Sequence, residues 1–154
     1  GATLPRDLLD KMLAAKNVNV GLNMARQIYL STLDLEIHGT NPPTTAEGLQ
    51  ALVDRLRPEI SLIENPEGAN MLRSFGHLMN QYSAAYYGYL WAEVLSADMF
   101  AQCFEKDPFD AKAGKRYRDL VLAPGGVGKI LDHLTTFLGR PPSQEAFLKS
   151  RGIA

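Results

Sequence analysis

The sequence predicts an all-α fold. Apolar residues recur at helical spacing in several segments, and no segment of useful length alternates apolar and polar residues as a strand would. Breaks rich in proline, glycine or asparagine separate these segments, most clearly at residues 41–43, 107–108 and 141–142. The 154 residues are 45% hydrophobic and 21% charged, which is enough apolar material for a core. We therefore expect a single helical domain over residues 1–154.

Two helices are expected before the first clear loop, over residues 3–16 and 20–38. Thr3 is a candidate N-cap for the first helix, with Pro5 in its first turn. The second helix has few charges and should be buried on more than one side. His38 ends it beside Gly39, so we interpret His38 as a residue that caps the helix rather than as a ligand.

The middle of the chain is expected to alternate between helix and irregular structure. Thr44 or Thr45 can cap a helix over residues 46–56, and Pro58 should end or kink it. Residues 64–76 show no strong period and should form an irregular segment that leads to a long helix ending near Phe104. Loops of this kind carry function when rigid elements hold their ends.

Three further helices are expected after the break at residues 107–108. Asp110 should cap a helix that runs to about residue 122, and a second helix should cover residues 128–138. The inner face of the second helix should consist of Ile130, Leu131, Leu134 and Phe137. Ser143 then fits the start of a last short helix over residues 144–150.

The candidate functional residues gather in residues 74–104. This segment holds one His, four of the six Tyr and the only Trp of the chain. If a helix already holds at Tyr82, then Tyr82, Tyr86 and Tyr89 share one face of it, while Tyr87 and Trp91 are better candidates for the core. A row of phenols suits a wall that is packed behind and open to solvent in front, because each hydroxyl needs a partner. The alternative, that these rings only pack between helices, stays open.

Composition excludes several other classes of function. The formal charge is −1 and the pI about 6.3, so nothing attracts the chain to nucleic acid or to an anionic membrane. No apolar run approaches the roughly 18 residues that cross a bilayer. The lone Cys103 has no partner within the chain and suggests a reducing compartment. The first residues show no signal-peptide pattern. We expect a cytoplasmic protein.

Several motifs resemble one family. They are His77, Tyr82, the run AYYGYLWAEVLSADMF from Ala85, KRYRDLVLAPGG from Lys115, and FLGRPPSQEAFLKSRG from Phe137. Together they resemble the C-terminal region of the thimet oligopeptidase and neurolysin family of zinc metallopeptidases. The opening of the chain, up to His38, is similar to the part of those enzymes that follows their zinc site. The resemblance implies the helical C-terminal part of a zincin-type catalytic domain, and hence a piece of a longer enzyme.

The zinc site of that family is not in this sequence. Its zinc is held by a His-Glu-x-x-His helix and a downstream Glu, and no such motif occurs here. The histidines are His38, His77 and His133, which are never at the spacing of four residues that places two imidazoles on one metal. We therefore expect no metal ligand in this chain, with zinc bound by other parts of the parent, and no activity of this chain alone.

The resemblance implies roles for four residues. Tyr89 would donate to the oxyanion of the tetrahedral intermediate, Tyr86 and His77 would bind the substrate backbone, and Tyr82 is a further candidate. The family commonly has Gly-Gly before the first Tyr, whereas this sequence has Asn80 and Gln81 there, which favours an earlier helix start.

The resemblance also implies partners. These are short peptide substrates and the N-terminal remainder of the peptidase, with self-association of the aromatic face as a further expectation. The alternative from the residues alone is a helical module that binds a protein or peptide without catalysis.

Overall fold

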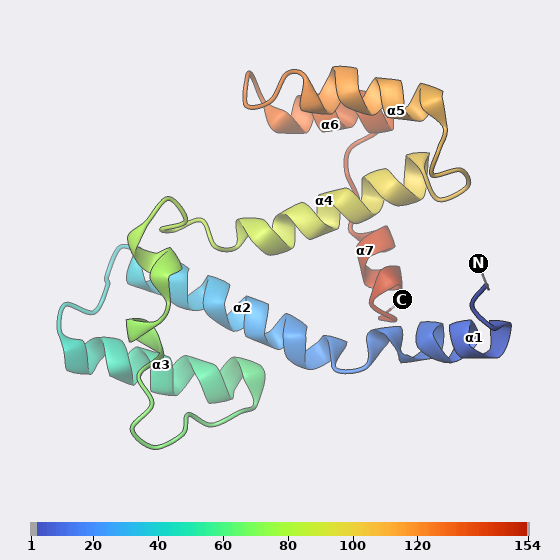
Figure 1. Ribbon diagram of the computed structural model, residues 1–154. Helices are drawn as coiled ribbons and strands as arrows, with labels where there is room; N and C mark the ends of the chain where they lie inside the picture. The colour runs from blue at the N-terminus through green and yellow to red at the C-terminus, as the bar shows by residue number, and fades with distance from the viewer. Residues whose placement is uncertain (1–2, 154) are drawn as a thin grey trace. The chain divides into compact units, whose positions relative to one another are not determined.

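The computed structural model describes residues 3–153, and the regular elements in that range are all helical (Figure 1), which confirms the predicted all-α fold. Short 3₁₀ turns lie at Ala15–Asn17, Met71–Arg73 and Gly76–Met79, and one π-helical turn lies at Arg118–Leu122. The α-helices are α1 (Arg6–Ala14), α2 (Val20–Ile37), α3 (Ala46–Ser61), α4 (Gly88–Cys103), α5 (Ala111–Tyr117), α6 (Ile130–Leu138) and α7 (Glu145–Ser150).

The chain forms two compact units, one that ends at Leu90 and one that begins at Trp91. The sequence predicts one domain over residues 1–154 and contains no signal for this division. Helix α4 runs through the boundary without a proline or glycine in its interior, so no composition change accompanies it.

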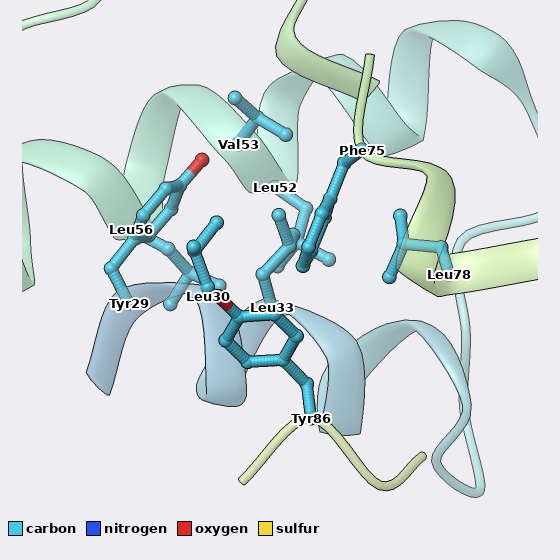
Figure 2. Packing of buried hydrophobic residues seen from close by; sticks show 9 residues of the cluster. All are labelled: Tyr29, Leu30, Leu33, Leu52, Val53, Leu56, Phe75, Leu78 and Tyr86. Atoms are coloured by element: carbon cyan, nitrogen blue, oxygen red, sulfur yellow. The ribbon is translucent and has the colours of Figure 1, made fainter. Parts of the chain in front are cut away.

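The core of the first unit lies where α2 packs against α3. Leu33 and Val53 are almost completely buried there, and the rings of Phe75 and Tyr86 close the cluster (Figure 2). Each such side chain contributes about 1.5 to 3 kcal/mol on burial. The irregular segment that follows α3 is therefore fixed to the two helices by its own aromatic residues.

The core of the second unit forms around Phe137 of α6. The rings of Tyr117 and Phe104 lie 5.7 Å and 6.4 Å from it. Arg116 of α5 donates to the Phe137 carbonyl at 2.6 Å and stacks its guanidinium over the Phe137 ring. Arg116 therefore links α5 to the end of α6 within this unit.

Several helix ends follow the predicted signals. Thr45 accepts the Gly48 N–H at 3.1 Å, and Asp110 accepts the Lys112 N–H at 2.8 Å. Pro5, not Thr3, is the N-cap of α1. The predicted end of this helix near Leu56 is wrong, because Pro58 lies inside α3 and the helix continues to Ser61.

The predicted inward faces of two helices are partly wrong. Tyr87 and Trp91 are about half exposed, and so are Ile130 and Leu131, whereas Leu134 and Phe137 are buried as predicted. Apolar residues are distributed all around α4, so its periodicity cannot select the face that packs.

Candidate functional site

Four aromatic rings of the first unit lie around the imidazole of His77. The ring of Tyr82 lies 5.4 Å from it, that of Tyr86 5.2 Å and that of Tyr89 5.9 Å. Phe75 lies 5.6 Å from the imidazole on the core side. The structure thus brings together all four residues that the sequence selects, His77, Tyr82, Tyr86 and Tyr89.

The sequence predicts that these rings meet on one face of a helix. In the structure they do not. Helix α4 begins at Gly88, so the expected helix at Tyr82 and the earlier start inferred from Asn80 and Gln81 are both wrong. The backbone before Gly88 runs through consecutive turns, in which the Ala85 N–H donates to the Tyr82 carbonyl at 2.9 Å. Asn80 itself favours a turn, because its side chain accepts the Tyr82 N–H at 3.0 Å.

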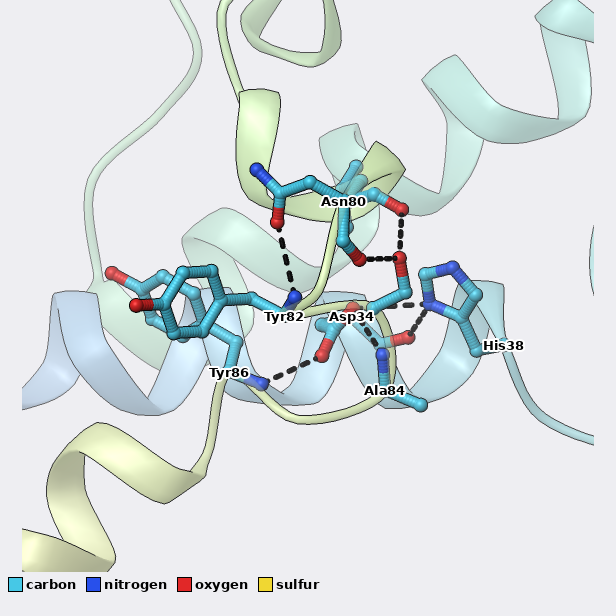
Figure 3. A network of polar contacts seen from close by, with 8 residues as sticks. Asp34, His38, Asn80, Tyr82, Ala84 and Tyr86 are labelled. Atoms are coloured by element: carbon cyan, nitrogen blue, oxygen red, sulfur yellow. Dashed lines mark hydrogen bonds and ion pairs between the residues drawn. The ribbon is translucent and has the colours of Figure 1, made fainter.

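Asp34 of α2 explains why the helix starts late. Its carboxylate is fully buried and accepts the N–H groups of Ala84 and Tyr86, each at 3.0 Å (Figure 3). Ala84 takes a left-handed conformation with φ +57°, which an α-helix does not allow. We call residues 80–87, held in this way against α2, the tyrosine turn.

His38 lies on the other side of the same carboxylate. Its Nδ1 is 3.0 Å from Asp34 Oδ1 and 2.9 Å from the Asp34 carbonyl oxygen. Because both partners are acceptors, Nδ1 carries a proton. His38 therefore ends α2, as predicted, and in addition supports Asp34.

The four predicted residues differ in how far a substrate could reach them. Tyr89 is 41% exposed, Tyr82 and His77 are half-buried, and Tyr86 is only 7% exposed. The ring of Tyr89 stacks on Tyr82, with centroids 5.2 Å apart. Tyr89 is thus the phenol of the cluster that is most open to solvent, while Tyr86 belongs to the core beneath it.

The environment of Tyr89 keeps its hydroxyl protonated. Hydrogen bonding with the Tyr82 side chain raises the pKa of the Tyr89 phenol to about 12. At neutral pH the group is therefore a neutral O–H that can donate to a developing negative charge.

The described residues 3–153 contain no group of three His, Cys, Asp or Glu side chains that could hold a metal ion. The imidazole of His133 forms a hydrogen bond with the backbone, because its Nε2 lies 2.7 Å from the Val127 carbonyl oxygen. The residues present therefore do not fit a zinc site. Within the same range, no helix is both long and apolar enough to cross a bilayer.

Sequence reasoning missed Asp34 as a residue of this site. A signal was present, because Asp34 is one of only two acids in the largely apolar sequence from Val20 to Ile37, and His38 follows four residues later. A buried carboxylate requires hydrogen-bond donors. The donors it found lie some fifty residues away in the chain, at Ala84 and Tyr86, and local periodicity cannot reveal them.

The FLGRPPS motif at the end of α6 has a structural explanation. Arg140 binds the buried Asp98 of α4 with two hydrogen bonds of 2.8 and 2.6 Å. Asp98 also accepts the Ser143 N–H at 2.7 Å. The motif thus fixes α7 and the turn before it to α4 within the second unit.

Comparison with known proteins identifies the family of this chain. The model of peptidase family M3 matches residues 1–153. The chain belongs to this family. It is 44% identical to saccharolysin of Saccharomyces cerevisiae over 99% of its own length, and 39% identical to a thimet-like oligopeptidase of Dictyostelium discoideum over 97%. It is also 33% identical to oligopeptidase A of Escherichia coli over 99% of its length.

This M3 chain spans only about a fifth of these relatives, since it covers 22%, 22% and 23% of their lengths. The predicted resemblance to the thimet oligopeptidase family is confirmed. Two plant relatives in Arabidopsis thaliana are named a probable cytosolic oligopeptidase A and an organellar oligopeptidase A, so relatives occur in more than one compartment.

Proposed function

We propose that this chain is the C-terminal portion of a zinc-dependent oligopeptidase and supplies substrate-binding and oxyanion-stabilising side chains for the hydrolysis of short peptides. Membership of peptidase family M3 supports a peptidase. Because the described residues do not fit a metal site, the zinc would be bound by the N-terminal remainder of the parent, and this chain alone would be inactive. We propose the cytoplasm as its compartment.

Tyr89 carries the proposal. It combines 41% exposure with a pKa raised to about 12, so a substrate can reach a hydroxyl that is protonated at neutral pH. When water adds to a peptide carbonyl, the oxygen becomes an oxyanion, and a fixed donor at about 2.7 to 3.1 Å lowers the barrier. We assign this donor to Tyr89.

The other residues of the cluster would orient the substrate. His77 contacts each of the three Tyr rings and is half-buried, so its imidazole is held in place for a contact with the substrate backbone. Tyr82 stacks on Tyr89 and would contact the same region. We also propose Tyr86 as a substrate contact. It is far less exposed than Tyr89, at 7% against 41%.

The test is Tyr89→Phe in the full-length peptidase that contains this chain. Loss of one oxyanion donor should lower kcat by about 10² to 10³, with little change in KM. Tyr87→Phe is the matched control, because it removes the same hydroxyl oxygen two residues earlier in the chain. The Tyr87 ring is half exposed and lies outside the His77 cluster. An unchanged kcat in Tyr89→Phe would remove Tyr89 from this role.

A further inference from the structure

The tyrosine turn depends on an acid that belongs to another element. The Asp34 carboxylate receives one N–H on each oxygen, from Ala84 and from Tyr86, and it is fully buried. Hydrogen bonds to a buried carboxylate are stronger than those between neutral groups. They are strong enough here to hold Ala84 at φ +57°, a conformation that alanine rarely adopts.

Two links lead from Asp34 to Tyr89. The N–H that Asp34 binds belongs to Tyr86, and the Tyr86 carbonyl accepts the Tyr89 N–H at 3.2 Å. The Tyr86 ring also packs against the Tyr89 ring, with centroids 5.1 Å apart in an edge-to-face arrangement. Asp34 thus positions Tyr86, and through it both the backbone and the ring of Tyr89.

The turn itself also has local hydrogen bonds. Ser83 Oγ donates to the carbonyl oxygens of Leu78 and Asn80 at 2.8 and 2.7 Å. These bonds fix the shape of the turn, whereas the two bonds to Asp34 fix its place on α2. A displaced turn with intact shape is the expected consequence when Asp34 loses its charge.

We propose that Asp34 is a positioning residue for catalysis, which holds Tyr89 at the site where the oxyanion forms. This inference rests on the function proposed for Tyr89. An amide at position 34 would offer one acceptor oxygen only, and its NH₂ group would face an N–H of the turn. A displacement of about 1 Å in a catalytic group can lower a rate up to about 10²-fold.

The experiment compares Asp34→Asn with Asp54→Asn in the full-length peptidase. Asp54 is the matched control, because its carboxylate also accepts side-chain hydrogen bonds, from Gln50 and Asn65, but lies on α3 and does not contact the turn. We measure kcat and KM on a short fluorogenic peptide, and hydrogen exchange in the segment that contains Ala84 and Tyr86.

Asp34→Asn should lower kcat by about 10- to 100-fold with a smaller change in KM, and exchange at Ala84 and Tyr86 should become faster. Asp54→Asn should change neither. If Asp34→Asn loses its helical circular dichroism, Asp34→Glu replaces it, because Glu keeps both acceptors but moves them by one methylene. A folded Glu variant with lowered kcat supports the proposal, and one with wild-type kcat overturns it.

The two variants distinguish a failure of the role proposed for Asp34 from a failure of the role proposed for Tyr89. If Tyr89→Phe lowers kcat while a folded Asp34→Asn does not, Asp34 has no positioning role and the assignment of Tyr89 remains. Unchanged exchange in Asp34→Asn would also overturn the inference. If Tyr89→Phe itself has wild-type kcat, the proposed function of Tyr89 fails and the inference fails with it.

Discussion

Two buried carboxylates show how single residues organise each unit. Asp34 binds two backbone N–H groups and a histidine, and Asp98 binds one backbone N–H and an arginine. A buried carboxylate is stable only with such partners. Each acid therefore fixes an irregular segment to a helix, the tyrosine turn in one unit and the segment around Ser143 in the other.

The pair of Asp98 and Arg140 predicts a pH-dependent stability. Hydrogen bonding with Arg140 lowers the pKa of Asp98 below its ordinary value of 3.8. A lowered pKa means that the ionised form stabilises the folded state above the unfolded pKa, and that this stabilisation is lost as pH falls through the folded pKa. The sign is thus stabilising at neutral pH and absent in strong acid.

We expect Asp98→Asn to lower the free energy of unfolding at pH 7 by about 3 kcal/mol, since it leaves Arg140 without its charged partner. The difference from wild type should shrink as the pH falls below about 3.9. Urea unfolding at pH 7 and through the acid range measures this. Asp119→Asn is the control, because that carboxylate pairs with Lys115 and Arg118 at the surface and its loss should leave the midpoint near wild type. A constant difference at all pH values would contradict the assignment.

At the scale of elements, the tyrosine turn shows a correct grouping obtained for the wrong reason. Helical spacing placed Tyr82, Tyr86 and Tyr89 on one face, and their rings do meet. They meet because consecutive turns, tied to Asp34, bring them around His77. A spacing of three or four residues aligns side chains in a helix and also in a run of tight turns, so the pattern alone does not distinguish the two.

The conformation of Ala84 gives a prediction for this element. Ala84→Gly should raise the free energy of unfolding by about 1 kcal/mol, because glycine adopts φ +57° without the steric cost that alanine has there. Ala85→Gly is the control. Its position is not among the residues with positive φ, so the added chain entropy should lower stability by about 0.5 to 1 kcal/mol. Thermal unfolding of both variants decides between gain and loss, and a loss in Ala84→Gly would show that the turn relaxes to another conformation.

At the scale of the whole molecule, this chain contains a candidate half of a catalytic site. It presents an exposed phenol over a rigid aromatic cluster, and its described residues contain no metal cluster. It spans about a fifth of its relatives' length. The proposed site, completed by another part of the parent, would account for both observations.

We expect the 154-residue chain to cleave no peptide when zinc is added, and its mixture with the remainder of the peptidase to regain cleavage of a short fluorogenic peptide. The physical reason is that the oxyanion donor and the metal would lie on different segments. A mixture made with the Tyr89→Phe chain is the control and should be slower. Peptide cleavage by the chain alone, abolished by a chelator, would contradict this division.

The sequence by itself determined the helical class, the two helix caps Thr45 and Asp110, and the membership of the family. Caps such as Thr45 and Asp110 act within a few residues, so local reading is sufficient. It also selected the four residues proposed for the site, through motifs that resemble the family. Exposure was predicted poorly for Trp91 and Ile130, because it depends on which faces other elements cover.

Only the tertiary structure decided where α4 begins, which phenol is open to solvent and what holds the tyrosine turn. Each of these depends on Asp34 meeting Ala84 and Tyr86 across half of the first unit's chain. Hydrogen bonds between residues so distant in sequence form only after α2 and the turn are packed together. The stretch from Asn80 to Gly88 is therefore a series of turns rather than the first turns of a helix.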